Sequence, residues 1–79
     1  MGPRLRTISE ACKSAGLQIR TLRYLHERGY LQATWLELGG QRVRVYDDVA
    51  VERIGRISAL LREGFPPRIA AGKAGPYSV

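Results

Sequence analysis

The sequence has few of the residues that build metal and redox sites. Among its 79 residues there is one cysteine, Cys12, and one histidine, His26. A single cysteine cannot form an internal disulfide, and one cysteine with one histidine supplies too few soft ligands for structural zinc. We therefore expect no metal and no other cofactor.

Long apolar runs are also missing. The longest wholly apolar runs are only a few residues, as in Ala59-Leu60-Leu61, whereas a membrane span needs roughly 18 in a row. The basic N-terminus, residues 1–6, reaches Glu10 without the apolar segment of a secretory signal. We expect a cytoplasmic protein with no membrane partner.

The sequence does not contain a recognisable catalytic motif. The serines are potential nucleophiles, but a triad needs a positioned base and an orienting carboxylate, and His26 alone on a helix face does not supply them. No glycine-rich loop is followed by Lys-Ser or Lys-Thr, since Gly39-Gly40 lies in a predicted hairpin. We expect no enzymatic activity.

The chain does have a strong excess of positive charge. A chain of 79 residues has material for one domain, and its net charge of +6 with a pI near 10.3 is typical of a protein that binds polyanions. Only Lys13 and Lys73 are lysines, and the guanidinium group of arginine is the better bidentate partner for phosphates and guanine edges. Charge alone leaves nucleic acid, an acidic protein, a membrane surface and plain solvation open.

Two short helices are predicted near the N-terminus. Thr7-Ile8-Ser9-Glu10 fits a capping box, so a helix should begin at Ile8 and end at Gly16. Its apolar stripe is Ile8, Ala11, Cys12 and Ala15. That position favours a buried Cys12 over a sensor thiol.

A second helix is predicted over residues 18–28, where Gly29 stops it. The helical periodicity places one set of side chains inward: Ile19, Leu22, Leu25 and His26. The remaining set points outward: Arg20, Arg23, Tyr24, Glu27 and Arg28. Two short helices joined by a tight turn, the second with a basic outer face, match the helix-turn-helix plan.

The periodicity then changes to alternation. Residues 34–38 and 41–46 flank Gly39-Gly40, which predicts a β-hairpin with one apolar face and Arg42 and Arg44 on the other. We expect Trp35 to pack in the core, because a small domain needs its large rings inside.

One longer helix and one short helix should complete the domain. Asp47 or Asp48 caps the longer one, which Gly64 ends and from which three arginines should face outward: Arg53, Arg56 and Arg62. A further turn or two begins at Pro66 and is stopped by Gly72. The predicted organisation is a basic arm over 1–6, a domain over 7–71 and a flexible tail over 72–79.

The order helix, turn, helix, hairpin, helix, together with Arg20-Thr21-Leu22-Arg23-Tyr24 in the second helix, resembles the MerR family of bacterial transcriptional regulators. Residues 18–24, Gln-Ile-Arg-Thr-Leu-Arg-Tyr, resemble its recognition-helix motif x-V-R-T-L-R-Y, and residues 27–31 resemble E-x-G-L-L. Arg44-Val45-Tyr46 matches the R-x-Y that closes the family's wing, and residues 60–65 resemble L-R-E-L-G-F. The resemblance covers about residues 8–71, and the wing residues 38–42 are similar to those of the small BldC-like branch.

The chain departs from the family pattern at two places and in its extent. Tyr24-Leu25-His26 replaces Tyr-Tyr-Glu, and Gln32 replaces a proline. Members normally continue into a dimerisation helix and an effector domain, so we expect either an excised domain or a standalone regulator. We expect a monomer in free solution, and a monomer, dimer or head-to-tail array on DNA.

The resemblance implies a mostly α-helical winged helix-turn-helix with three to four helices and a two-stranded wing. It implies a nucleoid-associated regulator that binds double-stranded promoter or operator DNA, with residues 18–28 in the major groove and the 34–46 hairpin on the flanking backbone or minor groove. The expected contact residues are Gln18, Arg20, Thr21, Arg23, Tyr24, Arg42 and Arg44. Tyr24 is expected to contact a phosphate, whereas the other helix residues can read bases or hold phosphates.

Two other functions remain open at this point. The winged-helix scaffold also suits an anti-activator or co-regulator that uses its basic face on an acidic protein. An excisionase-like architectural protein of a mobile element would share the fold and differ in its DNA target.

Overall fold

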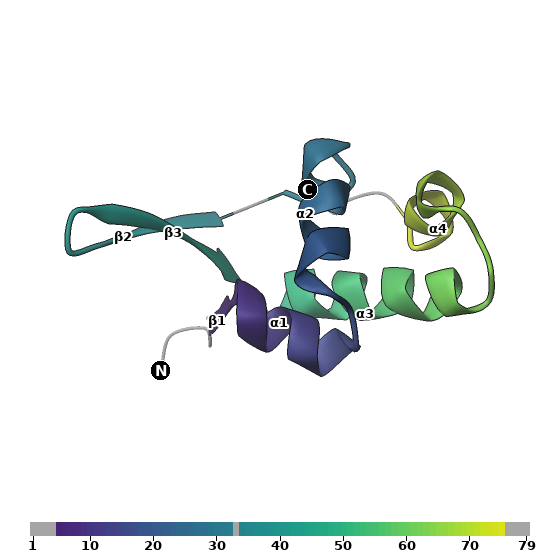
Figure 1. Cartoon of the computed structure of the whole chain (residues 1–79), viewed down its shortest axis with the longest axis horizontal. Helices are drawn as coiled ribbons and strands as arrows, with labels where there is room; N and C mark the ends of the chain where they lie inside the picture. Colours follow the sequence, from purple (N-terminus) through teal and green to yellow (C-terminus); the bar gives the residue numbers. More distant parts are fainter. Residues whose placement is uncertain (1–4, 33, 76–79) are drawn as a thin grey trace.

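The chain folds into four helices and a three-stranded antiparallel sheet over the residues that the computed structural model describes, 5–32 and 34–75 (Figure 1). The elements in chain order are β1 (Arg6–Thr7), α1 (Ile8–Ala15), α2 (Ile19–Glu27), β2 (Thr34–Leu38), β3 (Gln41–Tyr46), α3 (Asp48–Arg62) and α4 (Pro67–Lys73). This mostly helical arrangement with a projecting hairpin confirms the winged helix-turn-helix.

The helix-turn-helix forms where the sequence predicts it. The Thr7 hydroxyl accepts a hydrogen bond from the Glu10 amide at 3.2 Å, and a Glu10 carboxylate oxygen accepts one from the Thr7 amide at 3.0 Å. These two bonds complete the capping box. Gly16 ends α1 with a φ of 69°, a left-handed conformation in which glycine carries no steric penalty. Helix α2 begins at Ile19, with Gln18 as its N-cap.

The sheet has one strand more than the sequence predicts. Strand β3 lies in the centre, with β2 on one side and β1 on the other. Arg6 pairs with Tyr46 and Thr7 with Val45. Arg6 also forms an ion pair with Asp48 at 2.9 Å, so this residue belongs to the base of the wing and not to a separate arm. Residues 1–4 of the predicted arm lie outside the described residues.

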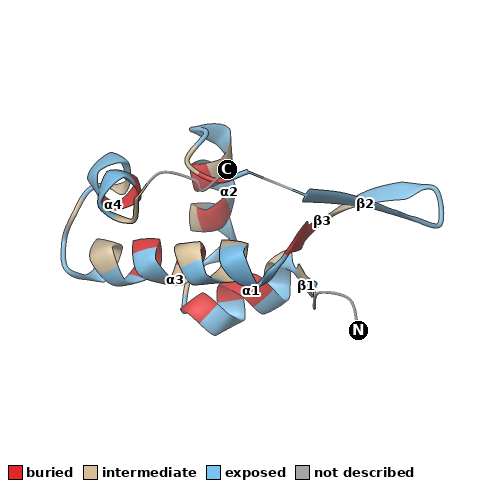
Figure 2. Ribbon diagram, turned by 180° about the vertical axis from the view of Figure 1, so that it is seen from behind, coloured by how far each residue is buried: buried red, intermediate tan, exposed pale blue. Residues whose placement is uncertain are grey.

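The core lies where α1, α2, α3 and α4 face one another, and the wing projects away from it (Figures 1 and 2). The most deeply buried large side chains are Leu22, Leu25, Tyr46, Ile54 and Ile57. Ser58, also buried, donates to the Ala15 carbonyl at 2.8 Å and thereby joins α3 to the end of α1.

Ile19 is 39% exposed and does not lie in the core, contrary to the helical-wheel prediction. It occupies the first position of α2, where the tight turn from α1 enters the helix, and it is only partly covered there. Leu22 and Leu25, one and two turns further along, are fully buried and fix the orientation of α2.

The C-terminal helix is longer than expected. Pro67 occupies the first turn of α4, where its missing N–H costs nothing, and the helix continues through Gly72 to Lys73. A glycine inside a short helix only lowers its propensity, and burial of Ala70 and Ala71 against the core offsets that loss. The start predicted for the tail, at residue 72, is therefore wrong. Residues 76–79, which include Ser78, lie outside the described residues.

Candidate nucleic-acid interface

The exposed face of α2 carries a shallow polar hollow. It has a volume of about 480 Å³ and is lined by Arg20, Arg23, Tyr24 and Glu27. Arg23 and Tyr24 lie three and four positions after Arg20, and Glu27 lies three positions after Tyr24, so the four residues share one side of the helix. The structure thus brings together Arg20, Arg23 and Tyr24 of the predicted contact residues. Within the described residues, no acidic side chain pairs with either arginine of the hollow.

Arg28 holds the Tyr24 side chain in place. Its Nε donates to the Tyr24 hydroxyl at 3.2 Å, and its guanidinium carbon lies 5.5 Å from the centre of the Tyr24 ring. The hydroxyl keeps its own proton to donate outward, and the ring is 39% exposed. Tyr24 therefore presents a hydroxyl donor at the edge of the hollow.

The other two predicted residues of this helix lie beside the hollow and do not line it. Gln18 is exposed at the N-cap, next to the free backbone amides that begin α2. Thr21 is half-buried, so only part of its side chain is available to a ligand.

The hairpin separates its side chains into two faces, as predicted. The register pairs Trp35 with Arg44 and Glu37 with Arg42, which places all four side chains on one face of the wing. The opposite face carries the aliphatic side chains Leu36, Leu38 and Val43. We call the face with Trp35, Glu37, Arg42 and Arg44 the basic wing face.

Trp35 does not pack in the core, so that prediction is wrong. Its side chain is 46% exposed, and its ring contacts two guanidinium groups. The guanidinium carbon of Arg42 lies 4.8 Å and that of Arg44 5.1 Å from a ring centre of Trp35. The reason is that the hairpin projects beyond the helices, so at position 35 neither face of the sheet meets the core.

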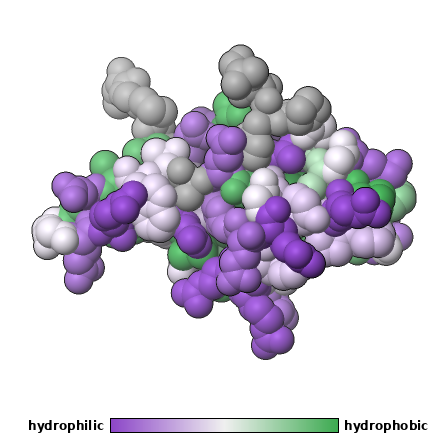
Figure 3. Space-filling model, turned by 90° about the horizontal axis from the view of Figure 1, so that it is seen from above, coloured by the Kyte–Doolittle hydropathy of each residue, from purple (hydrophilic) through white to green (hydrophobic). Residues whose placement is uncertain are grey.

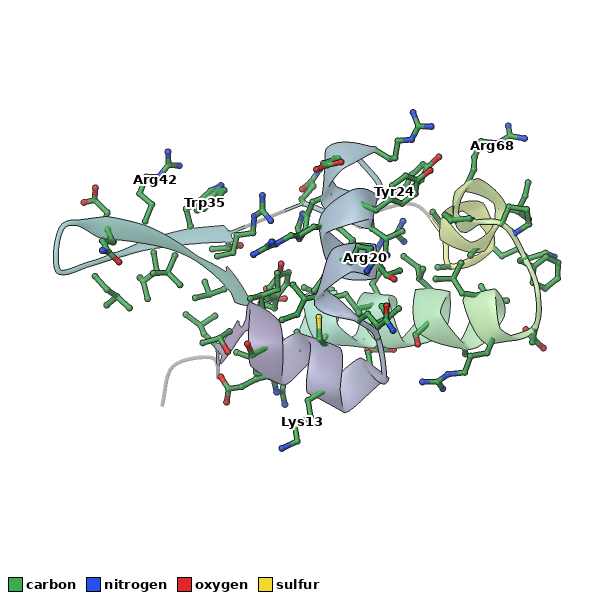
Figure 4. The ribbon with its side chains drawn as sticks, in the orientation of Figure 1. Lys13, Arg20, Tyr24, Trp35, Arg42 and Arg68 are labelled. Carbon is green, nitrogen blue, oxygen red and sulfur yellow. The ribbon has the colours of Figure 1, made fainter. Side chains whose placement is uncertain are left out.

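The basic wing face and α4 present cations on the same side of the molecule. In Figure 4, Arg42 and Trp35 leave the wing on the side on which Arg68 leaves α4, whereas Lys13 leaves α1 on the opposite side. Helix α2 stands between the wing and α4 along the longest dimension, which is 40 Å (Figure 1). Seen from above, hydrophilic side chains extend across the molecule along this dimension (Figure 3).

Arg68 is a candidate that the sequence analysis missed. It is exposed in the first turn of α4 and lies at a second shallow hollow of about 420 Å³, which Gly29 and Tyr30 at the end of α2 also line. The only local signal was an arginine after the Pro66-Pro67 helix start. Its position beside α2 depends on how α3 and α4 pack.

Two other arginines, predicted to face outward, turn toward the protein. Arg53 donates to the carbonyl oxygens of Tyr30 and Ala71, both at 3.4 Å, and to that of Gly75. Arg62 donates to the Ala15 carbonyl at 2.9 Å. Free carbonyl groups at helix ends attract such cations, so these two guanidinium groups stabilise the fold.

His26 joins α2 to the base of the wing. Its Nε2 lies 2.7 Å from the hydroxyl of Tyr46, and the side chain is half-buried, as predicted. Burial lowers the pKa of His26, the positive charge of Arg44 lowers it further, and a hydrogen bond with the Leu31 backbone opposes both effects. The imidazole is therefore held in its neutral form.

The described residues hold no other recognisable centre. Within 5–32 and 34–75, no three residues of the types His, Cys, Asp and Glu come together to hold a metal ion. No helix in the same part of the chain is long and apolar enough to cross a membrane. Cys12 is 4% exposed, and burial raises the pKa of its thiol.

Comparison with models of protein families gives a match over most of the chain. A family model described as "MerR HTH family regulatory protein" matches residues 6–72. The match begins in β1 and ends in α4, so it includes the whole helix-turn-helix and the wing. No curated protein matches the chain.

Proposed function

Because the chain belongs to the MerR family of helix-turn-helix regulatory proteins, we propose that it binds promoter or operator DNA sequence-specifically, with α2 in the major groove. DNA binding in transcription regulation is the general function of this family. The observation that supports α2 as the helix that reads the DNA is the polar hollow on its exposed face, whose two arginines have no acidic partner within the described residues. Along the long axis of the molecule, this hollow is flanked by Arg42 of the wing and Arg68 of α4.

The proposed contacts on α2 differ in kind. Arg20 and Arg23 can each donate two parallel hydrogen bonds to O6 and N7 of a guanine, and these contacts would supply the sequence preference. Tyr24 donates its hydroxyl to a phosphate. Gln18 and Thr21, at the start of the helix, contribute hydrogen bonds to the backbone next to the groove.

The elements on either side would position α2. Arg42 and Arg44 on the basic wing face contact the flanking backbone, and Arg68 contacts a phosphate on the other side. The 40 Å dimension that contains these elements is close to one helical turn of B-DNA, about 34–36 Å. We therefore propose that a single copy binds a half-site of about one turn.

The test starts from a randomised duplex library, from which bound duplexes are selected and sequenced. We expect an enriched motif, bound at least about tenfold, or 1.4 kcal/mol, more tightly than a scrambled duplex at physiological salt. Failure to enrich any motif would contradict sequence-specific binding. Enrichment that reflects only duplex bending, with no base preference in the selected site, would instead favour an architectural role.

Substitutions then separate base contacts from general charge. Arg20→Ala and Arg23→Ala should each cost about 1–3 kcal/mol on the selected duplex and reduce the preference at one or two base positions. Lys13→Ala removes the same charge from α1, on the side opposite Arg42 and Arg68, and should leave both quantities unchanged. Equal losses for all three variants would mean that only net charge matters.

A further inference from the structure

Trp35 is the only tryptophan of the chain, and the structure leaves it exposed. Burial of a large aromatic ring is one of the main sources of stability in a small domain. Nearly half of this side chain nevertheless stays in contact with solvent at the wing. Folding alone does not account for a ring at this position.

The contacts of Trp35 keep the ring in a defined place. The two guanidinium groups at 4.8 and 5.1 Å are within the range of cation–π attraction, and the strand pairing fixes the arginines that carry them. A tryptophan has only two side-chain torsions, so little entropy remains to be lost when a ligand covers it. The ring is therefore preorganised for contact.

We propose that Trp35 is a DNA-contact residue whose exposed ring packs against the deoxyribose wall of the minor groove flanking the site of α2. This inference rests on the proposed function and extends it. The sugars are the apolar part of the DNA backbone, and phosphates lie on both sides of each sugar. A ring next to two guanidiniums matches this alternation, because Trp35 covers the sugar while Arg42 and Arg44 contact the phosphates.

The other face of the wing offers a natural comparison. Leu36 is 39% and Leu38 56% exposed, so exposed apolar side chains occur on both faces. The cross-strand partners of these leucines are Val43 and Gln41, which carry no charge. Only the basic wing face combines an apolar surface with cations, and it points to the same side as Arg68.

Arg44 gives a second observation at the same place. Its Nε is buried and has no hydrogen-bond partner within the described residues. A buried donor without a partner costs free energy, so the free wing leaves this group unsatisfied. A phosphate next to the sugar that Trp35 covers would supply an acceptor to the Arg44 guanidinium.

Three readouts on the selected duplex test the inference. Bound DNA should shield the Trp35 ring, so acrylamide quenching of the tryptophan emission should fall at least threefold on complex formation. Trp35→Ala should weaken binding about tenfold and Trp35→Phe about threefold, whereas Leu38→Ala, on the opposite face, should stay within twofold. Hydroxyl-radical cleavage, which attacks deoxyriboses, should show a short protected stretch in the flanking minor groove that Trp35→Ala abolishes.

The outcomes separate this inference from the proposed function. If Trp35→Ala binds with wild-type affinity and an unchanged cleavage pattern, and acrylamide quenching of the wild-type tryptophan does not change on DNA binding, the role of Trp35 is overturned and the role of α2 stays intact. A failure of the wild-type protein to bind any duplex would overturn both. Equal losses for Trp35→Ala and Leu38→Ala would show that wing stability matters and would also overturn the contact. Circular dichroism confirms that each variant is folded.

Discussion

The guanidinium of Arg62 lies beside the α-carbon of Gly16, in the space that a β-carbon would occupy. It donates to the carbonyl oxygen of Gly16 at 3.3 Å and to that of Ala15 at 2.9 Å. Carbonyl groups at the end of a helix lack partners within the helix, and α3 supplies one to α1. The left-handed turn before α2 is thus fixed by a contact from α3.

Gly16→Ala should therefore destabilise the fold. A non-glycine residue in the left-handed region costs about 1–2 kcal/mol, and displacement of Arg62 adds to that cost. Gly55→Ala is the matched control, because Gly55 lies inside α3 with open space at its β-carbon position. It should be neutral or stabilise by up to about 1 kcal/mol. Urea unfolding measures both, and equal midpoints would contradict the role of Gly16.

The burial of His26 next to the charge of Arg44 predicts a pH-dependent stability. Because the folded state lowers the pKa of His26, protonation favours the unfolded chain. The free energy of unfolding should be at its full value above pH 6.5, the ordinary pKa of the group, and should fall as the pH drops below it. His26→Gln should remove this part of the pH dependence. Urea unfolding at several pH values tests it, and parallel curves for the two proteins would exclude it.

Glu37 places a negative charge on the basic wing face, opposite Arg42. If this face meets phosphates, Glu37→Gln should strengthen DNA binding about twofold to fivefold at low salt, and the gain should shrink as salt screens the charges. Glu63→Gln, at the end of α3, removes an equal charge away from the wing and should have a smaller effect. Equal gains for the two variants in an anisotropy titration would speak against a wing contact.

Cys12 should be chemically inert in the folded protein. Its side chain is 4% exposed, and burial raises the pKa of the thiol, which disfavours the reactive thiolate. We expect an aromatic disulfide reagent to modify it at least about a hundredfold more slowly in buffer than in urea, because reaction requires opening of α1. Rapid modification of Cys12 in the native protein would contradict this prediction and favour a role as a sensor thiol.

Local signals allowed much of the fold to be predicted from the sequence. The capping box at Thr7 and the Gly39-Gly40 turn act over a few residues, so the bounds of α1 and of the hairpin follow directly from them. Strand β1 could not be predicted, because two residues have no periodicity and this strand exists only through its pairing with Val45 and Tyr46.

The candidate site divides in the same way. A helical wheel suffices to place Arg20, Arg23 and Tyr24 on one exposed face. The exposure of Trp35 and the position of Arg68 depend on how far the wing projects and on how α4 packs, and neither appears in local sequence. The inward turn of Arg53 likewise depends on carbonyls from residues 18 to 23 positions away.

The two ends of the wing differ in how firmly they are held. All five residues of β2 are exposed, whereas burial along β3 increases toward Val45 and Tyr46, which are 6% and 1% exposed. Amide protons near Gly40 should consequently exchange through small local openings, and those at Tyr46 only when the whole domain unfolds. The wing is therefore a compliant tip on a rigid base: the angle between its base and α2 is set, while its end is free to bend.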